Sequence, residues 1–218
     1  MALKEGIESV NGYRFSLSYA PWSRETLDAV WSKNQDLKTF LHLHAPYSSA
    51  MEAYLKERST VNFFIKRDPR DLVVSLLNHY KNIEFNNKVV ESLPNDDERL
   101  LYMIRNFSRR QTLAFMGWIQ SPQCCVLDFR KLMGAHGGAA TDEDAMSEMR
   151  KIASALHMKL SDNKLRTIYR KHFGKGWNFF RGKVGAWKDY FKDEHINAAK
   201  EEIGDLLIEL GYEKNVDW

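Results

Sequence analysis

An arginine and a serine stand at a spacing that suits the binding of an anion. In NFFIKRDPRDLVVSLLNHY, Arg67 ends an apolar run typical of a strand, and Asp68 and Pro69 lead into an amphipathic stretch typical of a helix. A cation is thereby held beside a helix amino terminus, where exposed N–H groups and the helix dipole favour negative charge. Ser75, two helical turns further on, could donate to the same anion. Alternatively, Arg67 pairs with Asp68 or Asp71, and the serine bonds back to a helix carbonyl.

Two alternating histidines form a second candidate. FLHLHAPYS places His42 and His44 on one side of an expected strand that Pro46 ends. Two such histidines could ligate a metal, but no third Cys, His or carboxylate follows at a recognisable spacing. We therefore expect no metal site, and a structural role is the plainer interpretation.

A third segment, FGKGWNFFRGKVGAWKDYF, combines glycines with cationic and aromatic residues. Glycines let backbone N–H groups converge on an anion, and Arg181 and Lys183 supply charge. Trp177, Phe179 or Phe180 could stack on a purine. The structural alternative is a surface loop held by aromatic anchors.

Two of these segments resemble motifs of the PAPS-dependent sulfotransferases. KRDPRDLVVS is similar to the 3′-phosphate-binding pattern R-[DN]-P-[RK]-D-x-x-x-S, and RGKVGAWKDYF is similar to the closing-loop signature R-K-G-x-x-G-x-W-K. The family has two basic residues before the first glycine, whereas this chain has Phe180 and then Arg181. The resemblance implies a set of residues that bind the 3′-phosphate of PAPS or PAP: Arg67, Ser75, Arg181, Gly182 and Lys183.

The resemblance also implies a catalytic base. His44-Ala45-Pro46 occupies the place of the family's H-x-P, so His44 would accept the proton of an acceptor hydroxyl as its oxygen attacks sulfur. CCVLDFRKLMG resembles a further strand and loop of the family, V-x-x-x-[FY]-E-D-L-x-G. Here Arg130 and Lys131 replace the acidic pair, so the resemblance implies a strand at this point and no function.

The family's 5′-phosphosulfate loop, P-[KR]-S-G-[TS]-x-[WL], has no matching string in this sequence. SLSYAPWSRETL has the order of strand, turn and helix, but it lacks the glycine that a tight anion-binding turn needs. We expect the chain to begin downstream of the true loop. Residues 14–19, a second copy of the chain or an upstream polypeptide could take the place of the missing strand.

The elements that must position these residues alternate along the chain. We expect strands over 14–19, 39–44, 61–66 and 124–129, and helices over 24–33, 48–57, 70–81, 96–118, 142–156 and 161–172, then a terminal helix that Gly211 ends. Residues 134–141 read as a flexible interruption. The alternation predicts a single α/β domain over 1–218, with a parallel β-sheet flanked by helices. The resemblance implies the P-loop-NTPase-like sulfotransferase fold, with its first strand missing or replaced.

Charge, cysteine content and the lack of long apolar segments limit the partners and the location that we expect for this protein. The formal charge is +3, from 32 Lys and Arg against 29 Asp and Glu, which is too small to indicate a nucleic-acid partner. The adjacent Cys124 and Cys125 indicate neither a disulfide framework nor a metal site, and no signal peptide or membrane span is visible, so we expect a cytoplasmic protein.

The sequence thus favours an enzyme that transfers sulfuryl from PAPS, without a metal, to a hydroxyl or amine of a small-molecule or glycan acceptor. The sequence leaves open whether the chain forms a homodimer. A catalytically silent PAP-binding domain and a kinase-like nucleotide binder are the alternatives.

Overall fold

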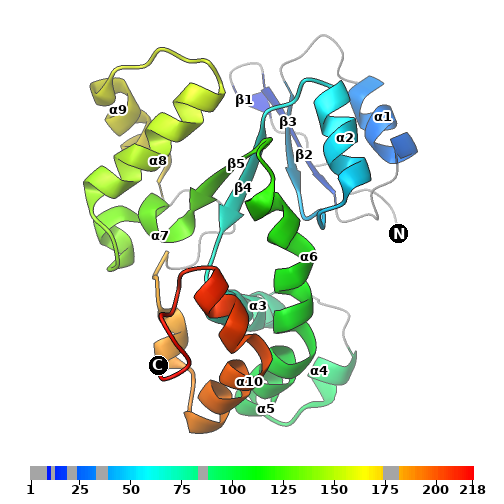
Figure 1. Cartoon of the computed structure of the whole chain (residues 1–218), viewed down its shortest axis with the longest axis vertical. Coiled ribbons are helices and arrows are strands. Elements are labelled where there is room, and N and C mark those ends of the chain that lie inside the picture. Colours follow the sequence, from blue (N-terminus) through cyan, green and yellow to red (C-terminus); the bar gives the residue numbers. More distant parts are fainter. Residues whose placement is uncertain (1–8, 11–12, 19–23, 33–38, 83–87, 174–181) are drawn as a thin grey trace. The chain divides into compact units, whose positions relative to one another are not determined.

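The computed structural model describes residues 9–10, 13–18, 24–32, 39–82, 88–173 and 182–218. The chain divides into two compact units, residues 1–59 and 60–218, and each is described by itself. A single domain over residues 1–218 stays a prediction. The helices and strands carry the labels of Figure 1.

The first unit contains a small sheet of strand order β1-β2-β3. Its elements are β1 (Ser9–Val10), β2 (Tyr13–Ser18), α1 (Arg24–Ser32), β3 (Thr39–Leu43) and α2 (Ser49–Glu57). β1 is antiparallel to β2, whereas β2 is parallel to β3, with Arg14 opposite Thr39 and Ser18 opposite Leu43. The strand expected over 14–19 therefore pairs with the strand that precedes His44. The turn at 19–23 lies outside the described residues.

The second unit is built on two parallel strands. Its elements are β4 (Asn62–Lys66), α3 (Pro69–Asn82), α4 (Lys88–Ser92), α5 (Asp96–Met103), the π-helix η1 (Ile104–Ser108), α6 (Arg109–Gln120), β5 (Cys124–Asp128), α7 (Phe129–Leu132), the 3₁₀ helix η2 (Gly134–Gly137), α8 (Asp142–Ala155), α9 (Asp162–His172), the 3₁₀ helix η3 (Ala186–Asp189) and α10 (Asp193–Glu209). β4 and β5 pair in register, from Asn62 opposite Cys124 to Lys66 opposite Asp128. Their carboxyl ends therefore lie side by side.

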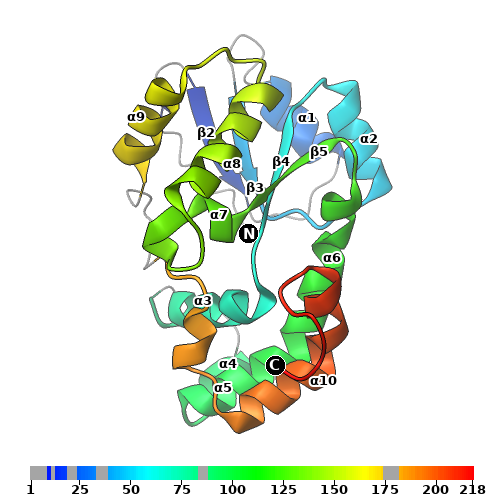
Figure 2. The same ribbon diagram turned by 60° about the vertical axis from the view of Figure 1, so that its left-hand side comes forward.

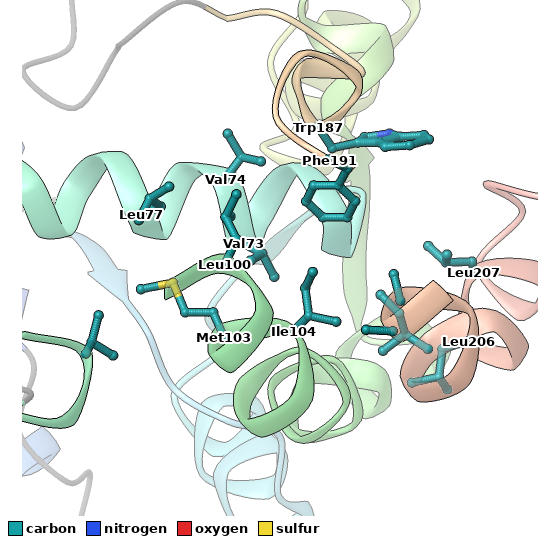
Figure 3. Close-up of a cluster of buried hydrophobic side chains, with 14 residues drawn as sticks. Val73, Val74, Leu77, Leu100, Met103, Ile104, Trp187, Phe191, Leu206 and Leu207 are labelled. Atoms are coloured by element: carbon teal, nitrogen blue, oxygen red, sulfur yellow. The ribbon is translucent and has the colours of Figure 1, made fainter. Parts of the chain in front are cut away.

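A helical core supports these strand ends. The buried face of α3 packs against α5, η1 and η3, and α10 belongs to the same buried cluster (Figure 3). Val73 and Leu77 of α3 and Ile203 and Leu207 of α10 are almost completely buried. At about 1.5–3 kcal/mol for each large apolar side chain removed from water, this cluster holds α3 firmly in place. In Figure 2, α10 lies alongside α5 and α6.

The helix expected over 96–118 contains a π turn. The side chains of Ser108 and Thr112 donate back to the carbonyls of Ile104 and Ser108, an interaction that competes with regular α-helical geometry. The helical run nevertheless continues from Asp96 to Gln120 through α5, η1 and α6.

The other expected elements are confirmed to within about two residues where the structure describes them. Of residues 134–141, the first four form η2, the next three form a turn and bends, and Thr141 forms the capping box of α8; the flexibility expected for this stretch stays a prediction. Among the described helices, none has the length and apolar character needed to cross a membrane.

Candidate anion-binding site

A capped turn joins β4 to α3. Pro69 is the first helical residue, and Asp68 precedes it as the capping residue. Asp68 Oδ1 accepts the Arg70 backbone N–H at 2.9 Å, and the Asp68 carbonyl accepts the Leu72 N–H at 2.9 Å. One of the helix N–H groups expected to face an anion is thus already satisfied by Asp68. An anion bound at this turn would therefore meet cationic side chains more than free backbone N–H groups.

Arg67 projects from the carboxyl end of β4 without an ionic partner. Its guanidinium lies over the Phe129 ring, 4.5 Å from the centroid. Its Nε is buried and has no hydrogen-bond partner, and no described carboxylate lies within ion-pairing distance. Burial lowers the pKa of Arg67, partly opposed by Asp71 and Asp68, yet an arginine stays charged at neutral pH. Arg67 is thus a partly buried cation, and the ion pair with Asp68 or Asp71 that we gave as the alternative is not observed at bonding distance.

Both nearby carboxylates are occupied by other groups. Asp68 receives the Arg70 guanidinium through two bonds, from Nε at 3.0 Å and from Nη2 at 2.8 Å. Asp71 accepts backbone N–H groups of Gly185 at 2.8 Å and of Trp187 at 3.0 Å. Neither carboxylate forms an ion pair with Arg67, although the charge of both still opposes the fall in its pKa.

Ser75 lies on α3 and is half-buried. Its hydroxyl forms no hydrogen bond with the residues that the structure describes, so the alternative in which it bonds back to a helix carbonyl is not observed. A hydroxyl that keeps its donor can offer it to a ligand.

Asp71 joins the closing-loop segment to the amino-terminal turn of α3. Its side chain is 1 % exposed, and its two bonds reach residues far along the chain. Burial raises the pKa of Asp71, the Trp187 and Gly185 N–H groups oppose that shift, and Asp68 adds to it. The two segments singled out by the sequence are therefore in direct contact.

Arg70 forms the centre of an aromatic clamp. Its guanidinium lies 4.2 Å from the Trp187 ring centroid and 4.3 Å from that of Trp218, and the two indoles meet edge to face. Glu213 adds an ion pair to Arg70 Nη1 at 2.6 Å. Trp187 is 8 % exposed and also packs on Phe191, as Figure 3 shows. Trp187 thus anchors its loop.

The closing-loop segment is described from Gly182 onwards, and Arg181 lies outside the described residues. Gly182 and Gly185 have φ values of 62° and 73°, a region that favours glycine. Lys183 is exposed, and its Nζ contacts Asp189 at 2.5 Å. This surface ion pair is weak enough to exchange for another anion.

Gly137 of η2 supports the same segment. Its carbonyl accepts the Val184 N–H at 3.0 Å. A Cβ at Gly137 would lie 2.6 Å from Met133 Cβ and 3.0 Å from Val184 Cγ2. Only a glycine lets η2 approach this closely.

The end of β5 repeats the geometry of the β4 end. Asp128 Oδ1 accepts the Arg130 backbone N–H at 2.9 Å, and its Oδ2 accepts Arg130 Nη2 at 2.9 Å. The Arg130 guanidinium also lies 4.5 Å from the centroid of the Tyr212 ring. The basic residue that replaces the family's acid is therefore paired within its own turn.

His44 belongs to the first unit, directly after β3, and its side chain is exposed. Ala45, which follows it, is 7 % exposed, and Ser48 caps α2 by accepting the Met51 N–H at 3.1 Å. Tyr54 on α2 donates to Asp28 at 2.7 Å and so joins α2 to α1. These contacts fix the backbone of the His44 loop. The side chain of His42 lies outside what the structure describes.

Sequence reasoning missed the carboxyl-terminal tail, residues 210–218. Tyr212 lies against Lys66 at the end of β4, and Glu213 and Trp218 contact Arg70 in the first turn of α3. The aromatic residues around Gly211 were a signal, but nothing in their spacing indicates which distant residues they contact.

Two solved structures share this fold. Mouse sulfotransferase SULT7A1, determined in complex with PAP, superposes with a TM-score of 0.65 at 15% identity, over 90% of this chain and 74% of that one. Retinol dehydratase, determined in complex with androsterone and inactive cofactor PAP, gives 0.61 at 20% identity, over 84% of this chain and 56% of its own. No protein-family model matches the sequence, and no curated protein matches it either.

The fold of this chain is that of the sulfotransferases, as its motifs led us to expect. The chain spans little more than half the length of retinol dehydratase.

Proposed function

We propose that this chain binds PAPS through its 3′-phosphate and transfers the sulfuryl group to a hydroxyl or amine of a small-molecule or glycan acceptor. The observation that carries the proposal is Arg67, a partly buried cation beside the amino terminus of α3 that forms no ion pair with the described carboxylates and whose Nε has no hydrogen-bond partner. Partial burial without a close ionic partner disfavours the charged form of Arg67, and a bound phosphate dianion would offset that cost.

The residues of the proposed site divide by role. Arg67 and Ser75 hold the 3′-phosphate from one side, and the closing-loop residues Arg181, Gly182 and Lys183 hold it from the other. The Asp71 bonds to Gly185 and Trp187 support this division, because they join the two segments.

His44 is the proposed general base. It accepts the proton of the acceptor hydroxyl as that oxygen forms a bond to sulfur, and the bond from sulfur to the PAP oxygen breaks. PAP leaves with the electron pair of that bond. No metal takes part in this scheme, and among the described residues no group of three or more His, Cys, Asp or Glu gathers as a metal site.

Calorimetric titration with PAP and with AMP tests the binding half of the proposal, because AMP has no 3′-phosphate. We expect PAP to bind at least about tenfold more tightly than AMP, since a hydrogen bond to a charged group contributes about 1.5–3 kcal/mol. Arg67→Ala should remove this preference and leave AMP binding unchanged. Arg110→Ala is the matched control, because Arg110 is exposed and lies over Phe107, within the second unit. Equal affinity of the wild type for PAP and AMP would refute the proposal.

A second candidate is a silent PAP-binding domain. It is favoured by the missing phosphosulfate-loop string and by the self-paired Arg130. Sulfuryl transfer from labelled PAPS to any acceptor, lost in His44→Ala with PAP affinity retained, would reject it. Tight PAP binding without transfer across an acceptor screen would support it over the enzyme.

A further inference from the structure

The buried polar atoms without a hydrogen-bond partner in the described structure belong to the turn between β4 and α3 and to the carboxyl-terminal tail that contacts it. They are Arg67 Nε, Arg70 Nη1, Tyr212 Oη and Trp218 Nε1. Each carries a proton, so each is a donor. Arg70 Nη1 has Glu213 at 2.6 Å as an ionic partner, which leaves three donors unmatched. A cluster of donors without acceptors is complementary to an anion.

Tyr212 is the member of this cluster that no sequence motif indicates. Gly211 ends α10 with φ 73°, and the Tyr212 N–H donates to the Leu207 carbonyl at 2.8 Å, so the helix end fixes where the ring begins. The ring lies between two cations, 5.5 Å from Lys66 Nζ and 4.5 Å from the Arg130 guanidinium. Lys66 directly precedes Arg67 in the chain.

The Tyr212 hydroxyl is a donor at the pH of a cell. Burial and the carboxylates of Asp128, Asp68 and Asp71 raise the pKa of Tyr212, partly opposed by Arg130. The phenol therefore keeps its proton and can donate it. The same carboxylates are already paired with Arg130, Arg70 or backbone N–H groups, so they leave the phenol unmatched.

We propose that Tyr212 is a further ligand of the anion site, and that its hydroxyl donates to the 3′-phosphate that Arg67 holds. This inference rests on the proposed function. The hydroxyl is covered in the ligand-free chain, so the tail shifts to admit the phosphate oxygen. In surroundings of low dielectric constant, the resulting hydrogen bond is stronger than one formed in water.

Tyr212→Phe distinguishes a ligand role from a structural role through its effects on melting temperature and on PAP affinity. Removing a buried hydroxyl that has no partner should leave the melting temperature unchanged or raise it by about 2–4 °C, because an unmatched polar group is costly to bury. Removing a donor to a phosphate should weaken PAP binding about tenfold to a hundredfold. A structural hydroxyl would lower the melting temperature instead.

Tyr102→Phe is the matched control, because Tyr102 is half-buried in the same unit and contacts Phe107 away from Arg67. Calorimetry compares wild type and both variants with PAP and with AMP, and calorimetric melting compares them without ligand. We expect only Tyr212→Phe to weaken PAP binding, with AMP binding unchanged.

The outcomes distinguish the two proposals. If the wild type prefers PAP through Arg67 but Tyr212→Phe binds PAP as tightly, the role of Tyr212 is refuted and the proposed function stands. A lower melting temperature with unchanged affinity would likewise assign Tyr212 a structural role. If the wild type shows no preference for PAP over AMP, both proposals fall.

Discussion

Asp71 is the residue on which the contact between α3 and the closing-loop segment depends, and Asp71→Asn tests that contact. The carboxylate offers two acceptor oxygens to the N–H groups of Gly185 and Trp187, at 2.8 and 3.0 Å. An asparagine of the same shape offers one acceptor oxygen and one NH₂ group. One backbone N–H therefore loses its acceptor and faces a donor.

The magnitude follows from the burial of these groups. Losing one bond to a charged acceptor costs about 1.5–3 kcal/mol, and leaving a buried N–H unmatched costs about 1–3 kcal/mol. Removing a buried charge offsets part of this loss, because burial raises the pKa of Asp71 and so disfavours its ionised form. We expect a net loss of about 3 kcal/mol, or about 6–12 °C in melting temperature for a chain of this size.

Urea unfolding followed by tryptophan fluorescence measures this loss, and hydrogen exchange of the Gly185 and Trp187 amides locates it. Asp205→Asn is the control, because Asp205 also accepts two hydrogen bonds, from Arg109, but lies exposed at the surface. An exposed pair of this kind contributes about 0–1 kcal/mol. If Asp71→Asn destabilised the chain no more than Asp205→Asn and left both amides protected, the two bonds would not hold the loop.

Two further predictions concern stability. Gly137→Ala should destabilise the chain by about 1–3 kcal/mol in urea unfolding, because its Cβ would lie 2.6 Å from Met133 Cβ. Gly204→Ala is the control: it lies in α10, its Cβ would lie 3.9 Å from the nearest atom, and it should stabilise the chain by about 0.5–1 kcal/mol. Equal effects of the two substitutions would contradict the packing argument. Burial alone would raise the pKa of Asp128, but the bonds and charge of Arg130 outweigh it and lower the pKa below 3.8. Between the lowered folded pKa and 3.8 the unfolded chain binds more protons, so the stabilisation by Asp128 is present above this window and is lost as pH falls through it. The stability gap between wild type and Asp128→Asn should therefore narrow below about pH 3.8, and a gap that stays constant would refute this origin.

The strand–turn–helix around Arg67 could be predicted from the sequence, because the capping, turn and apolar-spacing signals that define it act over only a few residues. Asp68 caps, Pro69 suits the first turn, and the apolar spacing of α3 faces one core. The π turn at 104–108 was not predictable, because a serine and a threonine in a helical stretch do not show by type alone that the hydroxyls of Ser108 and Thr112 bond back to the chain.

Contacts between distant segments could be inferred only in part. The resemblance to sulfotransferase motifs indicated that the α3 turn and the closing loop meet, and Asp71 supplies the contact. The packing of Tyr212 on Lys66 and of Trp218 on Arg70 follows from the direction in which the chain leaves α10 at Gly211, and no periodicity encodes that direction.

The assignment of roles to the two arginines of the turn needed the structure. Arg67 and Arg70 flank Asp68 and Pro69, and either could bind an anion by type alone. Arg70 is saturated, since Asp68 and Glu213 neutralise it and two indoles cover its faces. Because Asp68 pairs with Arg70 and Asp71 accepts the closing-loop N–H groups, neither forms an ion pair with Arg67, although the charge of both still opposes the fall in its pKa. The binding capacity of Arg67 is therefore set by the pairing of its neighbours, and substitutions that free either carboxylate should weaken PAP binding even with Arg67 intact.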